Sequence, residues 1–483
     1  MKAISRATLM RWHLWIGIIV TLPMIAWSLS GVLHPIMSRV KPTVMHHMAP
    51  PLQLENDQLQ AFPKTILQQH GITSVYRINL VQFQGGTWYR VQLQAEQTPD
   101  NVFYIHTRTG KILDHGDQIY AQWLARYYSG EQQAKITSVS LVHNFSPEYP
   151  SINRLLPVWR VQFERDDGLR AFIDTSSSGL GKLVDTKTHL FKQFFFWFHD
   201  WSFLQSFESL RIILLSVLCL LSFVGGITGL WLYSGLYRKL HQPKNSIQKM
   251  KQYHRVMGLL FSLGLLMFSA SGVFHALSKF EPDTRHLVMD KQRFALQTIQ
   301  PSLPEILESA IQDKTIQSIN FHTVSQQPAL HLQVTKEHGQ QSLYIDPNTG
   351  ASLPHYDESY AKALAVSFSG IAAQHITSVE HITHFTNEYG FINKRLPVWK
   401  VSFDAPNHPY YFVHTASGHL AAKYDDISAL ERSSFSNLHK FGVLNALGRD
   451  IRDSIMAINA FALIVVSFLG IYVYLRRRKK HLA

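Results

Sequence analysis

The chain has 483 residues, of which 46% are hydrophobic and 16% charged, and its formal net charge is +13. A soluble chain of this length would be expected to form about three domains, but four stretches have about 20 residues or more with few or no charges, the length that a helix needs to cross a bilayer. These stretches, at roughly 14–36, 210–235, 256–278 and 454–475, exclude a wholly soluble protein. The single cysteine, Cys219, lies inside the second stretch and excludes a disulfide framework.

Basic residues gather beside these stretches. The N-terminal tail, the short middle loop and the C-terminal tail contain fourteen Lys and Arg and no Asp or Glu. Because Lys and Arg are retained on the cytoplasmic side of short loops, both termini and the middle loop are predicted to lie inside and both long loops outside. The positive charge is therefore a signal of topology and does not indicate binding to nucleic acid. The fourteen residues are Lys2, Arg6, Arg11, Arg238, Lys239, Lys244, Lys249, Lys251, Arg255, Arg476, Arg477, Arg478, Lys479 and Lys480.

The chain repeats itself once. Residues 11–34 reappear at 252–275, and the likeness continues through LPVW at 156–159 and 396–399 and ends with His199 over His439. Self-similarity over half a chain indicates a duplicated domain, because the repeats of solenoid proteins are far shorter. The residues kept in both copies include His13 with His254, Gly17 with Gly258, Ser30-Gly31 with Ser271-Gly272, His34 with His275, and His199 with His439.

The first apolar stretch has two readings. A cleaved signal peptide has a short apolar core before a cleavage site of small residues. This stretch runs over about twenty residues and matches an internal stretch that cannot be cleaved. The sequence therefore favours an uncleaved membrane anchor.

Both long loops show the period-two alternation of β-strands. In the first loop the alternating runs are 87–94, 101–113, 159–164 and 169–175, and in the second they are 329–335, 342–353, 399–404 and 410–415. Helical patterns at 58–71 and 301–313 precede the two sets. Each loop is therefore predicted to form a small α+β domain.

Three features of the chain resemble a known family. The strand and turn YIDPNTG at 344–350, its degraded copy YIHTRTG at 104–110 and the His-x3-Gly spans that start at His13 and His254 are similar to PepSY-associated transmembrane proteins. The resemblance covers essentially the full length. It implies a bacterial inner-membrane protein, and the family includes reductases of iron-siderophores that carry haem in their transmembrane helices.

The predicted fold class is a membrane α-helical bundle of four transmembrane helices with two α+β, PepSY-like extracytoplasmic domains and an internal two-fold duplication. The predicted localisation is the bacterial inner membrane, with the long loops in the periplasm. The predicted segments are the cytoplasmic tail and first span at 1–36, the first periplasmic domain at 37–208, the second span at 209–236, the basic cytoplasmic loop at 237–253, the third span at 254–278, the second periplasmic domain at 279–452, the fourth span at 453–476 and the basic tail at 477–483.

Histidines within or beside the spans are the candidate functional residues, because ionisable groups in a membrane helix are costly. His13 and His34 are 21 residues apart, which places them about 31 Å apart along one helix and broadly on the same side. Two-fold repetition about an axis along the membrane normal would bring His13 opposite His254 and His34 opposite His275. Paired neutral imidazoles are what a six-coordinate b-type haem needs as axial ligands.

His199 and His439 enter the second and fourth spans from the outer side and form a third pair. The outer end therefore has four histidines for one or two haems, and the sequence does not choose between the two outer pairs. With the inner pair, this predicts two or three haem b groups. A histidine at a helix end is often only an interfacial residue, but three pairs kept in both halves favour a functional role.

Small residues beside the histidines would let a flat macrocycle approach the helix backbone. They are Gly17, Gly31, Gly258 and Gly272. Glycines in membrane spans also serve plain helix packing. The aromatic run at 191–203 is typical of a membrane interface, although the wall of a substrate cleft is an alternative.

The leading functional hypothesis is a transmembrane ferric-siderophore reductase. A cytoplasmic or membrane electron donor would reduce the inner haem, and the outer haem would reduce a ferric siderophore or other iron chelate and release iron(II). No nucleotide-binding or metalloprotease motif is found in the chain, so the donor is a separate molecule. The alternative is a non-enzymatic, membrane-anchored protein whose PepSY-like domains bind peptides or envelope proteins. A permease is a poorer match, because four spans without a broken helix or intramembrane acid make a poor pathway.

Overall fold

The computed structural model describes residues 5–52, 63–234, 243, 245–280, 287–298, 306, 315–324, 327–336 and 339–482. The chain divides into two compact units. The helical unit contains Met1–Lys41, Lys187–Pro282 and Ile427–Ala483, and the sheet unit contains Pro42–Thr186 and Asp283–Asp426.

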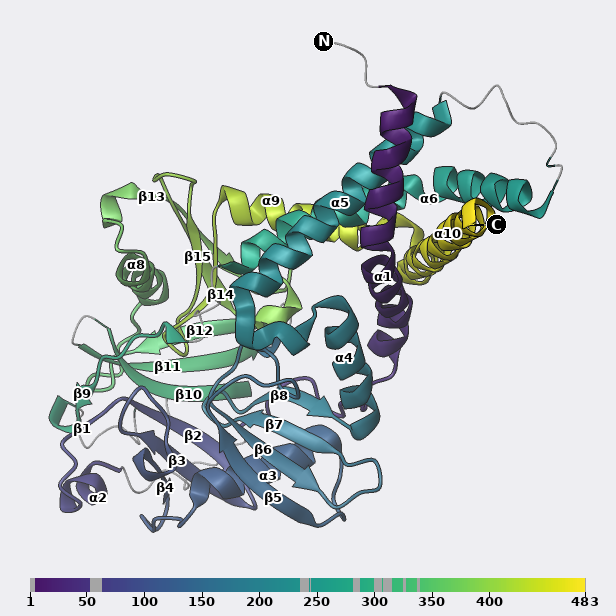
Figure 1. Cartoon of the computed structure of the whole chain (residues 1–483). Helices are drawn as coiled ribbons and strands as arrows, with labels where there is room; N and C mark the ends of the chain where they lie inside the picture. Colours follow the sequence, from purple (N-terminus) through teal and green to yellow (C-terminus); the bar gives the residue numbers. More distant parts are fainter. Residues whose placement is uncertain are drawn as a thin grey trace. The chain divides into compact units, whose positions relative to one another are not determined.

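Four long helices make up most of the helical unit (Figure 1). They are α1 (Arg6–Arg39), α5 (Glu208–Ser234), α6 (Ser246–Leu277) and α10 (Arg449–Leu482). Helix α5 packs on α1 and α6, and α10 also packs on α1 and α6. The helices thus form a four-membered ring in which α1 and α6, which are copies of each other, lie diagonally.

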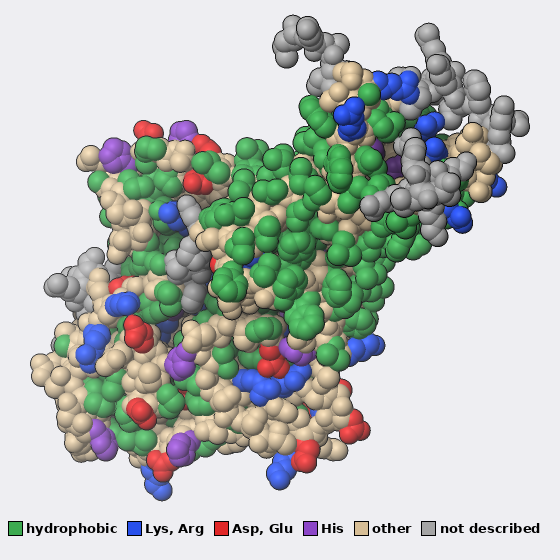
Figure 2. All heavy atoms as spheres, in the orientation of Figure 1, with side chains coloured by type: hydrophobic (Ala, Val, Ile, Leu, Met, Phe, Trp, Pro, Cys, Tyr) green, Lys and Arg blue, Asp and Glu red, His purple; other side chains and the backbone are tan. Residues whose placement is uncertain are grey.

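Each of these helices is long and apolar enough to span a membrane, which confirms the four predicted spans. The spans are Arg6–Met37, Ser202–Ser234, Ser246–Phe280 and Arg449–Arg476. Only 17–22% of the residues in the most apolar part of each span are buried, as expected where side chains face lipid rather than a protein core. Figure 2 shows this apolar surface, with Lys and Arg gathered near the end of the bundle where α1 begins.

The third helix begins earlier than predicted. Helix α6 starts at Ser246, so residues 246–253, which were assigned to the basic loop, are helical. The side chain of Asn245 accepts a hydrogen bond from the backbone N–H of Gln248 at 3.0 Å and caps the helix. Hydropathy marks the apolar part of a span and does not detect the polar turns that extend it.

Shorter segments lead into α5 and α10. In the first copy they are α4 (Thr186–His199) and η3 (Ser202–Phe207), and in the second they are α9 (Asp426–Ser434), the π-helical turn η10 (Phe435–His439) and η11 (Gly442–Leu447). The 3-10 turn η5 (Ser278–Phe280) follows α6. The aromatic run at 191–203 extends from α4 to the start of η3. His199 is the last residue of α4.

The two loops share one six-stranded sheet in the sheet unit. Its strand order is β12-β11-β10-β2-β3-β4. The strands are β2 (Arg77–Phe83), β3 (Gly86–Gln92), β4 (Val102–His106), β10 (Thr315–Val324), β11 (Gln327–Lys336) and β12 (Gly339–Ile345). Strands β2 and β10 pair antiparallel with Asn79 opposite Asn320, and the side chains of these two residues hydrogen-bond each other.

This shared sheet joins what the sequence described as one domain per loop. Asn79 and Asn320 are equivalent residues of the two copies, so the pseudo-two-fold axis of the sheet unit passes between them. Pairing β2 with β10 also covers an edge on each half, and exposed strand edges are prone to unwanted pairing. The two loops therefore form one compact unit.

Each copy adds a four-stranded sheet and a helix. The first copy has β5 (Ile136–Val142), β6 (Val158–Phe163), β7 (Arg170–Asp174), β8 (Gly179–Val184) and α3 (Gly116–Ser129), and the second has β13 (Ile376–Ile382), β14 (Val398–Phe403), β15 (Tyr410–His414), β16 (His419–Tyr424) and α8 (Tyr356–Ser369). The registers match: Ile136 pairs with Phe163 and Ile376 with Phe403. The α+β class and the duplication are confirmed.

Smaller elements complete the sheet unit. They are α2 (Pro63–Gln69), the paired strands β1 (Ser74–Val75) and β9 (Phe294–Ala295), and the 3-10 turns η1 (Pro99–Asn101), η2 (Ser151–Asn153), η7 (Leu296–Thr298), η8 (Ala373–His375) and η9 (Phe391–Asn393). Helix α2 confirms part of the predicted helix at 58–71. The helix predicted at 301–313 lies outside the described residues except for residue 306.

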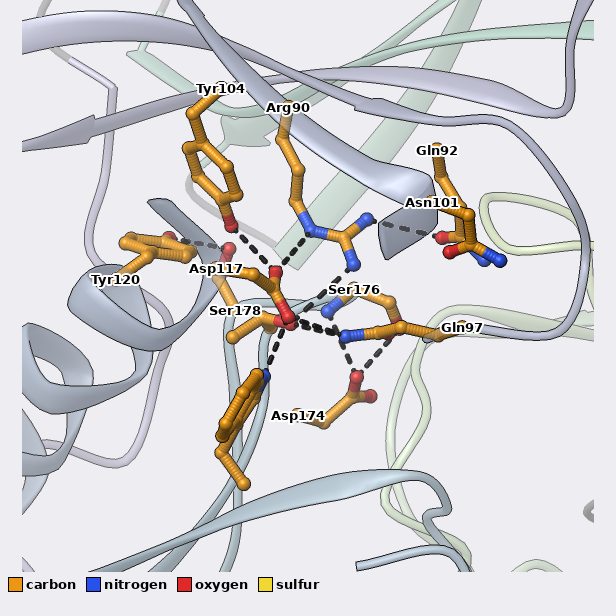
Figure 3. A network of polar contacts seen from close by, with 12 residues as sticks. Arg90, Gln92, Gln97, Asn101, Tyr104, Asp117, Tyr120, Asp174, Ser176 and Ser178 are labelled. Atoms are coloured by element: carbon orange, nitrogen blue, oxygen red, sulfur yellow. Dashed lines mark hydrogen bonds and ion pairs between the residues drawn. The ribbon is translucent and has the colours of Figure 1, made fainter. Parts of the chain in front are cut away.

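A buried polar network fixes α3 against the first half of the six-stranded sheet. The Arg90 side chain is fully buried and pairs with Asp117 at 3.2 Å. Asp117 also accepts hydrogen bonds from Tyr104, Gln97 and Trp159 at 2.9, 2.7 and 2.6 Å. Figure 3 shows Arg90, Tyr104 and Gln97 converging on this carboxylate. A buried charge pair is tolerated when its remaining atoms are hydrogen-bonded in this way.

The second copy keeps the carboxylate and changes the cation. Asp357 accepts a hydrogen bond from Trp399 at 2.7 Å, as Asp117 does from Trp159. At the position of Arg90 the second copy has His331, which is fully buried. The two copies therefore share a framework and differ in the charge at its centre.

A candidate cofactor site in the helical unit

The first histidine pair joins the two copies. His13 of α1 and His254 of α6 have ring centres 6.4 Å apart and ring planes inclined by 58°. The Nδ1 atom of His13 lies 3.1 Å from the carbonyl oxygen of Gly225, and that of His254 lies 3.0 Å from the carbonyl oxygen of Val466. A carbonyl only accepts, so each Nδ1 carries the proton and each Nε2 keeps its lone pair.

Glycines surround this first pair. A Cβ atom on Gly229 of α5 would lie 3.0 Å from Cε1 of His13, and one on Gly470 of α10 would lie 3.3 Å from Cε1 of His254. Within the described part of the chain, nothing lies within 4 Å of the Cβ positions of Gly17 and Gly258. These two glycines follow the histidines by four residues and lie on the same helix faces. Among the residues that the structure describes, no neighbouring side chain therefore covers the helix backbone at Gly17 and Gly258, one turn from the two histidines.

The second histidine pair is His199 and His439. Their ring centres are 5.9 Å apart and their planes are inclined by 84°. Nδ1 of His199 lies 3.0 Å from Oγ of Ser30, and Nδ1 of His439 lies 3.1 Å from Oγ of Ser271. Each serine hydroxyl donates its proton to a carbonyl of its own helix, at 2.8 and 2.7 Å. The hydroxyl therefore accepts from the imidazole, and Nε2 again keeps its lone pair.

Burial keeps the second pair neutral. It lowers the pKa of His199 and holds the pKa of His439 well below the usual range of histidine, because the charged form loses its hydration. The nearby imidazoles of His199 and His275 and the ammonium group of Lys440 add repulsion to the charged form of His439. A neutral imidazole is the form that ligates a metal.

His34 and His275 have different surroundings. The ring of His34 lies 5.5 Å from that of Phe195, and the ring of His275 lies 4.1 Å from that of Phe435. Nδ1 of His275 also lies 2.5 Å from a carboxylate oxygen of Glu431. Among the residues described, no ring contact joins His34 to His275. The structure thus brings together the first and second pairs but not this one.

Six rings form a continuous row across the two copies. The successive centre-to-centre distances are 5.5, 4.6, 5.9, 4.9 and 4.1 Å. The second pair lies in the middle of this row, and His34 and His275 lie at its two ends. In order, its members are His34, Phe195, His199, His439, Phe435 and His275.

Both pairs have the spacing of two axial ligands on one metal. With metal–nitrogen bonds of about 2.0 Å and each ring centre about 1.1 Å beyond its nitrogen, two imidazoles on opposite sides of an iron have centres roughly 6 Å apart. In the described residues, no group of three or more His, Cys, Asp or Glu side chains is placed to hold a metal ion. Each pair thus offers two imidazole nitrogens, the number of side-chain ligands that a six-coordinate haem iron would take.

Sequence reasoning named the histidines but missed what orients them. Ser30 and Ser271 were visible only as residues kept in both copies, and the carbonyl partners leave no side-chain signal. The glycines also divide into two roles. Gly17 and Gly258 face open space, whereas a Cβ on Gly31 would lie 3.6 Å from Ala460. Likewise, a Cβ on Gly272 would lie 3.1 Å from Sγ of Cys219, so Gly31 and Gly272 serve helix packing.

Comparison with known protein families gives one match. The family described as the PepSY-associated TM region matches residues 10–314, which is more than half of the chain. The match includes α1, α5 and α6, the first loop, and five of the six candidate histidines. No curated protein matches the chain.

Proposed function

Because this chain belongs to the PepSY-associated TM region family, we propose that it is a haem-containing electron-transfer protein of the bacterial inner membrane. Its proposed activity is the reduction of a ferric siderophore or another ferric chelate on the periplasmic side. The observation that carries the proposal is the pair of neighbouring imidazoles, found at two levels of the helical unit, in which each Nδ1 is hydrogen-bonded and each Nε2 keeps its lone pair.

The proposal assigns two haem b groups, one to each pair. His13 and His254 hold the first, and His199 and His439 hold the second. A bound haem supplies one-electron iron chemistry. The chain's own residues keep the imidazoles neutral, fix their tautomer and surround them with apolar side chains. His34 and His275 receive no ligand role, because among the described residues no ring contact joins them and Nδ1 of His275 lies 2.5 Å from a carboxylate oxygen of Glu431.

The proposed direction is from the cytoplasm outwards. The first pair lies near the basic helix ends that contain Arg11 and Arg255, which are predicted to stay in the cytoplasm. Along α6, Ser271 of the second site follows His254 by 17 residues, or about 25 Å of helix. A separate cytoplasmic or membrane donor would reduce the first site.

The substrate chemistry follows from iron itself. Hard oxygen chelators hold iron(III) tightly and iron(II) weakly, so one electron is enough to release the metal. The chain would supply the electron at the second site and would not need a nucleophile or a general acid. The released iron(II) and the free chelator are the products.

The direct test is the optical spectrum of the purified full-length protein. We expect the reduced protein to show haem b bands and a haem content of two per chain. Changing His13 and His254 together to Ala should remove one haem, and changing His199 and His439 together to Ala should remove the other. His70→Ala, at an exposed position of the sheet unit, is the matched control and should retain both.

Absence of haem, or full haem content in both double variants, would contradict the proposal. The first of these outcomes would favour the non-enzymatic alternative, in which the spans anchor a PepSY-domain binding protein. Reduction of a ferric chelate by the loaded, pre-reduced protein is the second measurement, with iron(II) trapped by a coloured chelator as the readout.

A further inference from the structure

We propose that the hydrogen bonds behind the two histidine pairs set the direction of electron flow. Backbone carbonyls accept the Nδ1 protons of the first pair, and serine hydroxyls accept those of the second. This difference gives the first site the lower reduction potential and makes electron transfer to the second site downhill. The inference rests on the proposed function.

The first site has the stronger acceptors. A peptide carbonyl oxygen carries more negative charge than a hydroxyl oxygen, so it draws the Nδ1 proton further from the ring. An imidazole that donates to such a partner is more basic and is a stronger electron donor to its metal. A stronger donor stabilises iron(III) relative to iron(II), which lowers the reduction potential.

Serine hydroxyls are the side-chain acceptors at the second site, where the backbone of Phe268 also interacts with His439. The hydroxyls of Ser30 and Ser271 already donate to helix carbonyls at 2.8 and 2.7 Å. This donation makes each oxygen a better acceptor than a free alcohol, but it remains weaker than a carbonyl. Both serines are almost completely buried, with 0% and 1% exposure, so water does not replace them as the partner.

The difference lies between the two levels of the bundle and not between the two copies. The hydroxyl of Thr228 also lies 3.3 Å from Nδ1 of His13, but the equivalent residue of the second copy is Leu469. The carbonyl is thus the partner that both members of the first pair share. At the second site the adjacent charges are opposite in sign, Asp200 after His199 and Lys440 after His439, so they offset each other. At the first site the positive charge of Arg255, which follows His254, acts in the opposite sense, so the hydrogen bonds must outweigh it for the first site to have the lower potential.

The first experiment measures the two potentials separately in the full-length, haem-loaded protein. The His13→Ala/His254→Ala variant retains the second site, and the His199→Ala/His439→Ala variant retains the first. In a potentiometric titration followed by haem absorbance, we expect the first site to have the lower midpoint. The expected separation is at least tenfold in the reduction equilibrium, which is about 59 mV for one electron. Equal midpoints, or a lower midpoint at the second site, would overturn the inference.

The second experiment changes the acceptor and keeps all the histidines. In the Ser30→Ala/Ser271→Ala variant the second pair loses its hydroxyl acceptors. The midpoint of the second site should therefore move to higher potential, while the midpoint of the first site stays unchanged. Ser222→Ala is the matched control, because Ser222 is a buried serine whose hydroxyl donates to the carbonyl of Leu218 at 2.8 Å. It should move neither wave.

The outcomes separate the inference from the function on which it rests. A protein without haem contradicts the proposed function. A protein with two haems whose serine variant shows an unchanged higher wave contradicts only the role of the serines. If the serine variant loses haem, Ser30→Thr/Ser271→Thr retains the hydroxyl acceptors and should restore both haem content and the native midpoint. Failure to restore the midpoint would also contradict the inference.

Discussion

Each paired histidine has one nitrogen engaged by a partner on a neighbouring helix, and that partner decides which tautomer is held. A carbonyl behind Nδ1 leaves Nε2 as the metal-binding atom. Histidines of the sheet unit are also buried, but their partners differ. His419 donates through Nδ1 to the carbonyl of Ser417 at 2.7 Å, and Nδ1 of His414 lies 2.5 Å from Oγ of the same serine. Two histidines therefore share one short turn.

Their burial predicts a pH-dependent stability. Burial lowers the pKa of His331 to about 4 and holds the pKa of His414 and His419 well below the usual range, with Arg395 and Arg77 adding repulsion at the last two. The unfolded chain binds protons near pH 6.5, at about the usual pKa of histidine. The folded chain does not, so stability is present above about pH 6.5 and is lost as the pH falls below it.

We expect the melting temperature of the full-length protein to fall between about pH 7 and about pH 5. His419→Gln should make this fall shallower, because one group that takes up a proton on unfolding is removed. His70→Ala, on an exposed surface, should leave the slope unchanged. A melting temperature that rises on acidification would show that other groups dominate.

The two copies also predict different costs for losing equivalent carboxylates. Asp117→Asn leaves the Arg90 guanidinium buried without its counter-charge, which costs about 3–5 kcal/mol. In the second copy His331 stands in place of Arg90, so Asp357→Asn leaves no buried guanidinium without a counter-charge. This substitution removes only hydrogen-bonding capacity and should lower the free energy of unfolding by about 1–3 kcal/mol. Thermal or denaturant unfolding of the two full-length variants compares them directly. If both variants lost the same free energy of unfolding, another group would have to compensate the charge of Arg90.

At the scale of the elements, the glycines of α1 and α6 predict which substitutions affect haem. Gly258→Leu would fill the open space beside His254, so the first site should lose haem while the second retains it. Gly272→Leu would instead press on Cys219 of α5 and loosen the packing of the helices. Haem content and melting temperature together separate the two effects. Full occupancy of the first site in Gly258→Leu would show that the macrocycle lies elsewhere.

The elements were predictable where the signal is local. Hydropathy located all four spans, and alternation located strands such as β3, β6 and β14, because each depends on the residues of a single segment. The start of α6 was missed, since an Asn cap within a polar loop carries little signal. The contacts of Ser30 with His199 and of Ser271 with His439 could not be predicted, because each joins residues far apart in the chain.

At the scale of the whole molecule, duplication places functional residues on both sides of a pseudo-two-fold axis. Each pair in the helical unit takes one histidine from each copy, so neither copy holds a complete site. The sheet unit follows the same rule, since its six-stranded sheet is complete only when β2 meets β10. Sequence repetition predicted the symmetry, but the pairing of β2 with β10 is a non-local contact that only the structure shows.

The Asn79–Asn320 pair on this axis provides the test that the two loops unfold together. Both side chains are buried and hydrogen-bond each other, so Asn79→Leu leaves a buried amide without that partner and should cost about 1–3 kcal/mol. Asn320→Leu should cost a similar amount. In the double variant both amides are gone, so the total loss should be smaller than the sum by at least about 0.5 kcal/mol.

The coupling energy is measured from the unfolding of the native protein, the two single variants and the double variant. A pair of asparagines in separately folding domains would give additive losses and two transitions. A non-additive cycle with one transition would establish that β2 and β10 unite the loops into one cooperative unit.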